Sequence, residues 1–124
     1  MARAAVTRSE MTAAVEMLRG GELSASQTRD AVRTTLRWFS QVHPGHTVEV
    51  RVPPHAAVQA VAGPRHTRGT PPNVVEMPPA VWLDLVRGVL SWEDALSAGQ
   101  VHASGIRASL AGLLPVTGRE ELPT

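Results

Sequence analysis

WLDLVRG (residues 82–88), ALSAGQVHASG (95–105) and ASLAGLL (108–114) are three apolar segments separated by only a few residues. The first predicts a helix over 80–87 that Gly88 ends, because glycine readily adopts the left-handed conformation that closes a helix. Ser91 then caps a second short helix, and residues 100–104 are expected to form a short strand. The third segment predicts a last helix over 108–114, ended by Pro115. With such short connections, these elements are expected to pack against one sheet.

Strands for such a sheet are predicted by the segment TVEVRV (47–52). Valine at 48, 50 and 52 alternates with threonine, glutamate and arginine, which is the pattern of a strand with one buried and one wet face. Pro53-Pro54-His55 breaks this strand, and residues 57–62 predict a second strand that pairs with it in antiparallel fashion. Residues 73–77 predict a third strand.

Two amphipathic helices are predicted before the strands. Ser9 can cap the first helix, and the pair Gly20-Gly21 stops it. Ser24 or Ser26 opens the second helix, which Pro44-Gly45 ends. Their apolar stripes are Met11, Val15 and Leu18 in the first helix and Val32, Leu36 and Phe39 in the second, with Arg29, Arg33 and Arg37 along another face of the second.

The order of the elements predicts an α+β fold, because helices and strands are segregated along the chain instead of alternating. We expect a small, mainly antiparallel sheet of four to five strands that is covered by helices on one face. A chain of 124 residues is too short for two stable cores, so residues 1–124 are expected to form a single domain. Within it, the N-terminal helices occupy 9–40, the sheet and C-terminal helices 46–115, and a frayed tail 116–124.

Composition excludes several functions. The chain has no cysteine, which removes thiolate catalysis and thiolate metal ligands. All 12 basic residues are arginine, so Schiff-base chemistry on lysine is excluded as well. A net charge of +1 argues against nucleic-acid binding. No segment approaches the roughly 20 apolar residues of a membrane span, so we expect a cytoplasmic protein without integral membrane association.

From residue 82 to residue 114, the sequence resembles the C-terminal part of sterol-carrier-protein (SCP2-like) domains. In both, a helix ends in glycine, a short helix ends in glycine, a strand follows, and a further glycine leads into a final helix. More narrowly, it resembles the short actinobacterial homologues of that family, in which a segment like RHTRGTPP (65–72) precedes the third strand. The resemblance covers about Thr47 to Pro115.

The resemblance implies a non-catalytic binding domain that holds a lipid or fatty-acyl chain between sheet and helices. The residues expected to line that tunnel are Trp82, Leu85, Val86, Val89, Trp92, Leu96, Leu110 and Leu113. Arg65, His66 and Arg68 are candidates for an anionic headgroup, because guanidinium groups form paired hydrogen bonds to carboxylate or phosphate. The competing interpretations are plain core packing for the apolar set and a solvated hairpin for the Arg-rich segment.

Other functional classes are less well supported by the sequence. His43 and His46 have an H-x-x-H spacing but lack further ligands nearby, so no metal or other cofactor is expected. No serine lies in a nucleophile elbow, and a catalytic domain would need a polar pocket converging on His66 or His102. The main alternative to a carrier is a ligand-free interaction module with a filled core, for example a homodimer. The sequence leaves open whether the first two helices cover a tunnel mouth or complete the core.

Overall fold

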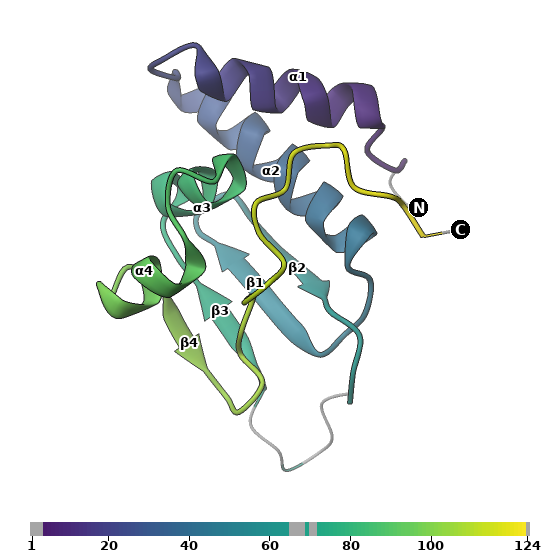
Figure 1. Cartoon of the computed structure of the whole chain (residues 1–124), viewed down its shortest axis with the longest axis vertical. Helices are drawn as coiled ribbons and strands as arrows, with labels where there is room; N and C mark the ends of the chain where they lie inside the picture. The colour runs from purple at the N-terminus through teal and green to yellow at the C-terminus, as the bar shows by residue number, and fades with distance from the viewer. Residues whose placement is uncertain (1–3, 65–68, 70–71, 124) are drawn as a thin grey trace.

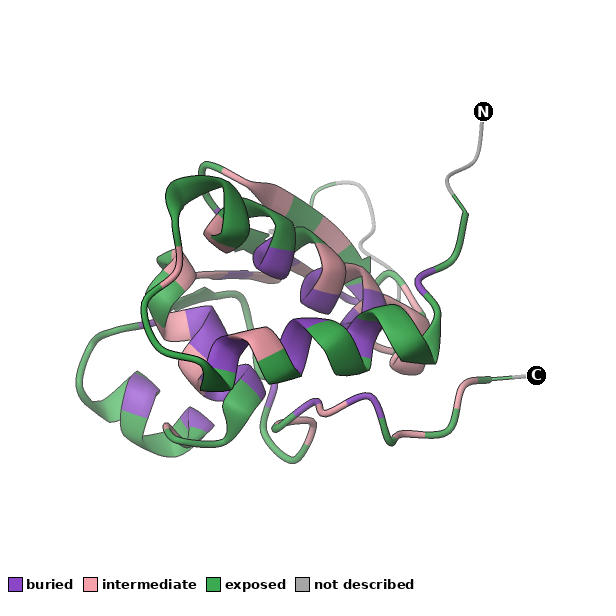
Figure 2. Ribbon diagram, turned by 90° about the horizontal axis from the view of Figure 1, so that it is seen from above, coloured by how far each residue is buried: buried purple, intermediate pink, exposed green. Residues whose placement is uncertain are grey.

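The computed structural model describes residues 4–64, 69 and 72–123 (Figure 1). The chain begins with two helices, α1 (Arg8–Arg19) and α2 (Ala25–Val42). The predicted cap of α1 at Ser9 is wrong, because the side chain of Thr7 accepts the hydrogen bond from the Glu10 N–H at 3.0 Å. Ser24 caps α2, which confirms one of the two predicted positions. Both helices turn their buried faces inward (Figure 2).

Within the described residues, the sheet has four strands: β1 (Val48–Val52), β2 (Ala56–Ala60), β3 (Val74–Glu76) and β4 (His102–Ser104). Their spatial order is β2-β1-β3-β4. The pairs β1–β2 and β3–β4 are antiparallel, whereas β1 and β3 are parallel. The sheet is therefore mixed but mostly antiparallel, as predicted, and β2 is one of its edges.

Alternation along β1 separates the two faces of the sheet. Val48, Val50 and Val52 are buried, whereas Arg51 is exposed and Glu49 is half-buried. The valines face the helices, because apolar side chains on every second residue point to the same side of a strand. The predicted α+β architecture, with helices packed against the sheet, is confirmed (Figure 1).

The region after β3 forms two helices, α3 (Pro79–Arg87) and α4 (Trp92–Ser97). Gly88 ends α3 with φ +77°, in the left-handed conformation expected there. The side chain of Ser91 caps α4 by accepting a hydrogen bond from the Asp94 N–H at 3.0 Å. Both predicted helices are confirmed. No helix among the described residues is long and apolar enough to cross a membrane.

The predicted last helix over 108–114 is wrong, since these residues form turns and extended chain. Ser109 accepts a hydrogen bond from the Ala111 N–H through its side chain, which replaces a helical bond. Gly112 has φ +79°, which is outside helical geometry. Leu110 is nevertheless fully buried, so the segment contributes to the core without being helical.

The predicted frayed tail is also wrong. We call residues 115–122 the C-terminal strap, which passes from α3 toward the start of α1 (Figure 1). The Val116 N–H donates to the Val86 carbonyl at 3.2 Å, and the Val116 side chain is fully buried. The Glu120 carboxylate accepts hydrogen bonds from the Trp38 indole at 3.1 Å and the Gly118 N–H at 2.9 Å. The strap is thus part of the packed structure.

Candidate ligand-binding groove

The predicted tunnel residues fall into two groups. Trp82, Leu85, Val86 and Leu110 are 0% exposed and Trp92 is 5% exposed, so these five are brought together in the hydrophobic core. Leu113 is half-buried at the edge of that core, whereas Val89 is 62% exposed and Leu96 is 45% exposed. The two exposed residues are not placed in the core with the others.

The core around Trp82 is densely packed. Its indole N–H donates to the Thr35 hydroxyl at 2.9 Å, and its ring meets Phe39 edge-on at a centroid distance of 5.6 Å. Trp82, Phe39 and Leu110 are fully buried. Trp92, by contrast, lines a hollow of about 260 Å³ beside Leu90 and Leu114.

The predicted polar candidates lie elsewhere. Arg65, His66 and Arg68 are outside the described residues. His43 packs against Phe39 with ring centroids 5.0 Å apart, and burial lowers its pKa despite a hydrogen bond to Leu113 and the charge of Glu120, both of which raise it. Among the described residues, no group of three or more metal-ligating side chains occurs.

His102, the other histidine considered for a polar pocket, lines a hollow of about 410 Å³ at the end of β3 and β4. Its cross-strand neighbour Glu76 lines the same hollow, together with Gln100 and the prolines at 53, 78 and 79. The described lining residues thus include a carboxylate and an imidazole at paired positions on β3 and β4, but no serine, threonine, cysteine or lysine.

Two adjoining hollows lie between α2 and the edge strand β2. One has a volume of about 270 Å³ and the other about 320 Å³. They share Arg37 and Val58, so we treat them as one feature, the α2–β2 groove. Its lining residues are Ala4, Ala5, Arg33, Arg37, Ser40, Gln41, His55, Ala56, Ala57 and Val58.

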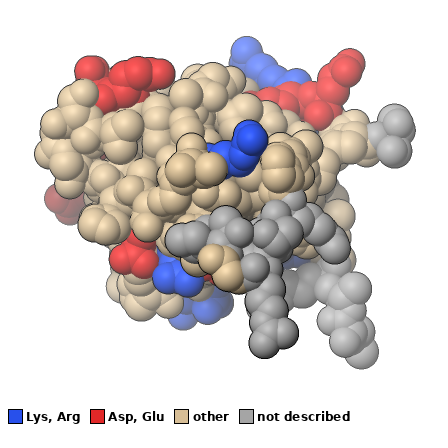
Figure 3. Space-filling model, turned by 90° about the horizontal axis from the view of Figure 1, so that it is seen from below, with Lys and Arg blue, Asp and Glu red and all other residues tan. Residues whose placement is uncertain are grey.

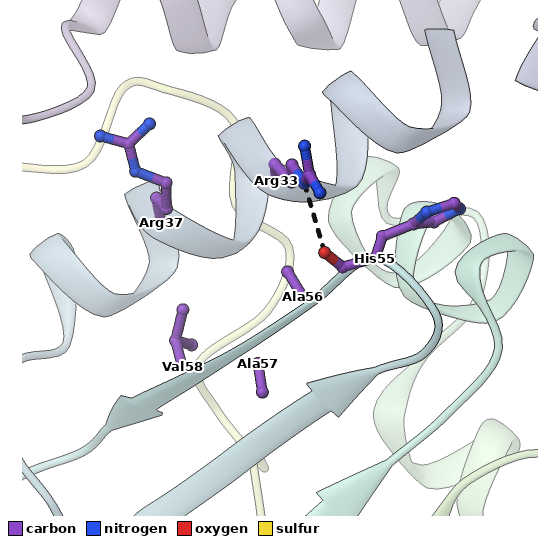
Figure 4. A pocket seen from close by; sticks show the side chains of 6 residues that line it. All are labelled: Arg33, Arg37, His55, Ala56, Ala57 and Val58. Atoms are coloured by element: carbon purple, nitrogen blue, oxygen red, sulfur yellow. Dashed lines mark hydrogen bonds between the residues drawn. The ribbon is translucent and has the colours of Figure 1, made fainter. Parts of the chain in front are cut away.

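The floor of the α2–β2 groove is apolar. Ala56 and Val58 are half-buried and point toward α2, whereas the exposed Ala57 points away (Figure 4). Ala4 and Ala5 continue the apolar lining on the N-terminal side. Successive side chains of β2 point to opposite sides, so two apolar side chains, Ala56 and Val58, lie beneath the polar residues of α2 that line the groove.

Side chains from α2 also protect the free edge of β2. The Ser40 hydroxyl donates to the Gln59 carbonyl at 2.8 Å, and the Arg33 Nε donates to the His55 carbonyl at 3.3 Å (Figure 4). Capped carbonyls cannot accept bonds from another strand, so these contacts disfavour edge-to-edge pairing. They also hold the Arg33 side chain over the groove.

The α2–β2 groove is positively charged. Arg33 and Arg37 lie four residues apart, so they are neighbours on one face of α2. Neither forms an ion pair with any carboxylate in the described part of the chain. Arg37 donates a hydrogen bond to the Ala4 carbonyl. Hydrogen bonds from Thr7 are the main cause of the lowered pKa of Glu10, and the positive charge of Arg37 also helps to lower it.

Sequence reasoning recognised the arginine row at 29, 33 and 37 without assigning it a role. The available signal was three arginines at helical spacing on the polar face of α2. Such a row usually faces solvent. Only the placement of β2 beside α2 brings two of these arginines, Arg33 and Arg37, to a hollow that Ala56 and Val58 also line.

These features define a small α+β domain with an apolar core and a surface groove between a helix and the edge of the sheet. Residues 24–116 match the family described as bacterial SCP ortholog, which is more than half of the chain. The protein therefore belongs to this family of sterol-carrier-like domains. No curated protein sequence matches the chain.

Proposed function

We propose that this protein is a non-catalytic carrier that binds the apolar chain of a lipid or fatty acid in the α2–β2 groove. Membership of the bacterial SCP ortholog family is the observation that carries this proposal. The groove supports it, since ligand sites typically combine an apolar lining with a few polar groups. Its two hollows, of about 270 and 320 Å³, reach the lower end of the size range of such sites.

The filled core favours the groove over the interior as the place of binding. An interior chain would have to displace side chains such as Trp82 and Leu85, which are fully buried. Each large apolar side chain contributes about 1.5–3 kcal/mol when it is buried, so opening the core has a large cost. The groove needs no such rearrangement. The tunnel lined by Trp82 and its core neighbours stays a prediction.

The driving force for binding would be removal of methylene groups from water. A fully buried methylene contributes about 0.8 kcal/mol, which corresponds to about a fourfold change in Kd. In a groove open on one side, about half of that is expected, or roughly twofold for each methylene. The affinity should therefore rise steadily with chain length until the chain passes the end of the groove.

A protein-interaction module is the second candidate, and the packing around Trp82 favours it. The Trp82–Thr35 hydrogen bond and the Trp82–Phe39 contact leave the interior closed, as expected for a domain that binds no ligand there. The two candidates differ in whether an acyl chain binds at all. Native mass spectrometry of protein purified from a bacterial host, followed by denaturing extraction, distinguishes them directly.

The proposal is tested by calorimetric titration with saturated fatty acids of increasing length. We expect a gain of two- to fourfold in affinity for each added methylene, followed by a plateau. Val58→Thr keeps the shape of the groove floor but makes it polar, and it should weaken binding by about two- to fivefold. Val89→Thr is the matched control, since Val89 is exposed and lines neither hollow of the groove. Affinity that does not vary with chain length would refute the proposal.

A further inference from the structure

Two guanidinium groups that form no ion pair with a described carboxylate lie beside an apolar floor, and they indicate what kind of headgroup the α2–β2 groove accepts. Like charges four residues apart on a helix repel each other, so Arg33 and Arg37 together disfavour the isolated helix. An anion placed between them removes that repulsion. Among the described residues, no carboxylate forms an ion pair with either arginine, and Glu10 interacts with Arg37 only at longer range.

We infer that Arg33 and Arg37 bind the carboxylate or phosphate headgroup of a single-chain amphiphile, an assignment that rests on the function proposed for the groove. The two residues hold the headgroup at the side of α2 while the chain lies along Ala56 and Val58 toward Ala4. Arg37 and Val58 line both hollows, so headgroup and chain sites are continuous.

The arginines have free hydrogen-bonding capacity for this role. A guanidinium group carries five N–H donors in a planar fork that fits two oxygens of a carboxylate or phosphate. Arg33 uses Nε for the His55 carbonyl and Arg37 uses one terminal nitrogen for the Ala4 carbonyl. Both side chains are therefore oriented by the fold while most of their donors remain available.

The same anion chemistry has two sources, a headgroup attached to a chain and a free anion. The headgroup is favoured because the floor beneath the arginines is apolar, and a free phosphate would gain nothing from Ala56 and Val58. The two sources are separated by titrating inorganic phosphate alone alongside dodecanoate, dodecyl phosphate and uncharged dodecanol.

The experiment measures the Kd of each compound by calorimetry for the unchanged protein and for the double variant Arg33→Gln/Arg37→Gln. We expect dodecanoate and dodecyl phosphate to bind at least tenfold more tightly than dodecanol. The double variant should lose that advantage, so that dodecanoate and dodecyl phosphate bind it no more tightly than dodecanol does. The affinity for dodecanoate should also fall when salt is raised from about 0.05 M to about 0.5 M, because exposed charges are screened.

Arg29→Gln is the matched control. It removes one positive charge from the same helix, half the change of the double variant, but Arg29 pairs with Asp30 at 3.3 Å and lines neither hollow. Its effect on dodecanoate should stay within about twofold. Arg33→Lys/Arg37→Lys retains the charge without the planar fork and should restore part of the affinity. Circular dichroism and thermal unfolding verify that each variant is folded.

The outcomes separate this inference from the proposed function. Equal binding of dodecanoate and dodecanol, unchanged in the double variant, would overturn the headgroup assignment while chain binding stands. Inorganic phosphate that binds as tightly as dodecanoate, with the same dependence on Arg33 and Arg37, would overturn the assignment to an amphiphile. Failure of every chain-bearing compound to bind would refute the proposed function itself.

Discussion

Thr35→Val tests whether the space between helices and sheet is closed. Thr35 and Trp82 are both 0% exposed, and the Thr35 hydroxyl accepts the Trp82 indole N–H at 2.9 Å. The same hydroxyl donates to the Ala31 carbonyl at 2.7 Å. Valine has nearly the shape of threonine but no hydroxyl, so the substitution leaves the indole N–H without a partner.

The magnitude follows from burial. An unsatisfied buried donor costs about 1–3 kcal/mol, and no water can replace the hydroxyl in a closed core. The Ala31 carbonyl keeps its hydrogen bond within the helix, so the loss of the Thr35 hydroxyl there adds little to the cost of the substitution. We therefore expect Thr35→Val to lower the free energy of unfolding by about 2 kcal/mol. For a chain of this size, that corresponds to a fall in Tm of about 8 °C.

Thr35→Ser is the control. It keeps the hydroxyl but removes one buried methyl group, at a cost of about 1 kcal/mol. Urea denaturation followed by tryptophan fluorescence measures both variants. The structure predicts that valine is the more damaging replacement, although its shape is closer to that of threonine.

A greater loss of stability for Thr35→Ser than for Thr35→Val would refute this reasoning. If Thr35→Val were as stable as the unchanged protein, water or another partner would have to reach the Trp82 indole. The interior would then be accessible, which would support the tunnel predicted from the sequence over the α2–β2 groove. A large cost for Thr35→Val instead supports a dry, filled core.

The C-terminal strap leads to two further predictions. Burial raises the pKa of Glu120, but hydrogen bonds from the backbone of residues 117, 118 and 120 and from Trp38 outweigh it, so the net pKa lies below its ordinary value of 4.5. Its stabilising effect is therefore complete above pH 4.5 and lost as pH falls through the folded-state pKa. Glu120→Gln should flatten the pH dependence of unfolding in that acidic range, and an unchanged profile would contradict this account. Val116→Ala removes two buried methyl groups and should cost about 2 kcal/mol in urea unfolding. A frayed strap would instead show a change below about 0.5 kcal/mol.

Much of the fold could be predicted because local interactions determine it. The alternating valines of β1 define a strand without reference to the rest of the chain, and Ser24, Ser91 and Gly88 mark helix ends through contacts within a few residues. The segment 108–114 was mispredicted for the same reason. Its apolar residues fit a helical stripe, but a side-chain bond from Ser109 and the positive φ of Gly112 favour turns.

The candidate site was harder to predict, because it depends on contacts between distant segments. The arginines at 33 and 37 and the apolar residues at 56 and 58 belong to different elements, and no pattern within either element indicates the other. The resemblance to carrier domains implies the set around Trp82, most of which the structure buries in the core.

The sequence by itself determined the element types up to β4, the α+β class and the family, because hydrophobic periodicity, caps and glycine positions act over a few residues. The tertiary structure alone decided that residues 115–122 pack against α1, α2 and α3, since the contacts of Val116 and Glu120 join segments far apart in the chain. It also decided that β2 forms an edge beneath the arginines of α2. Such placements arise from the burial of apolar surface summed over the whole chain, which no single segment encodes.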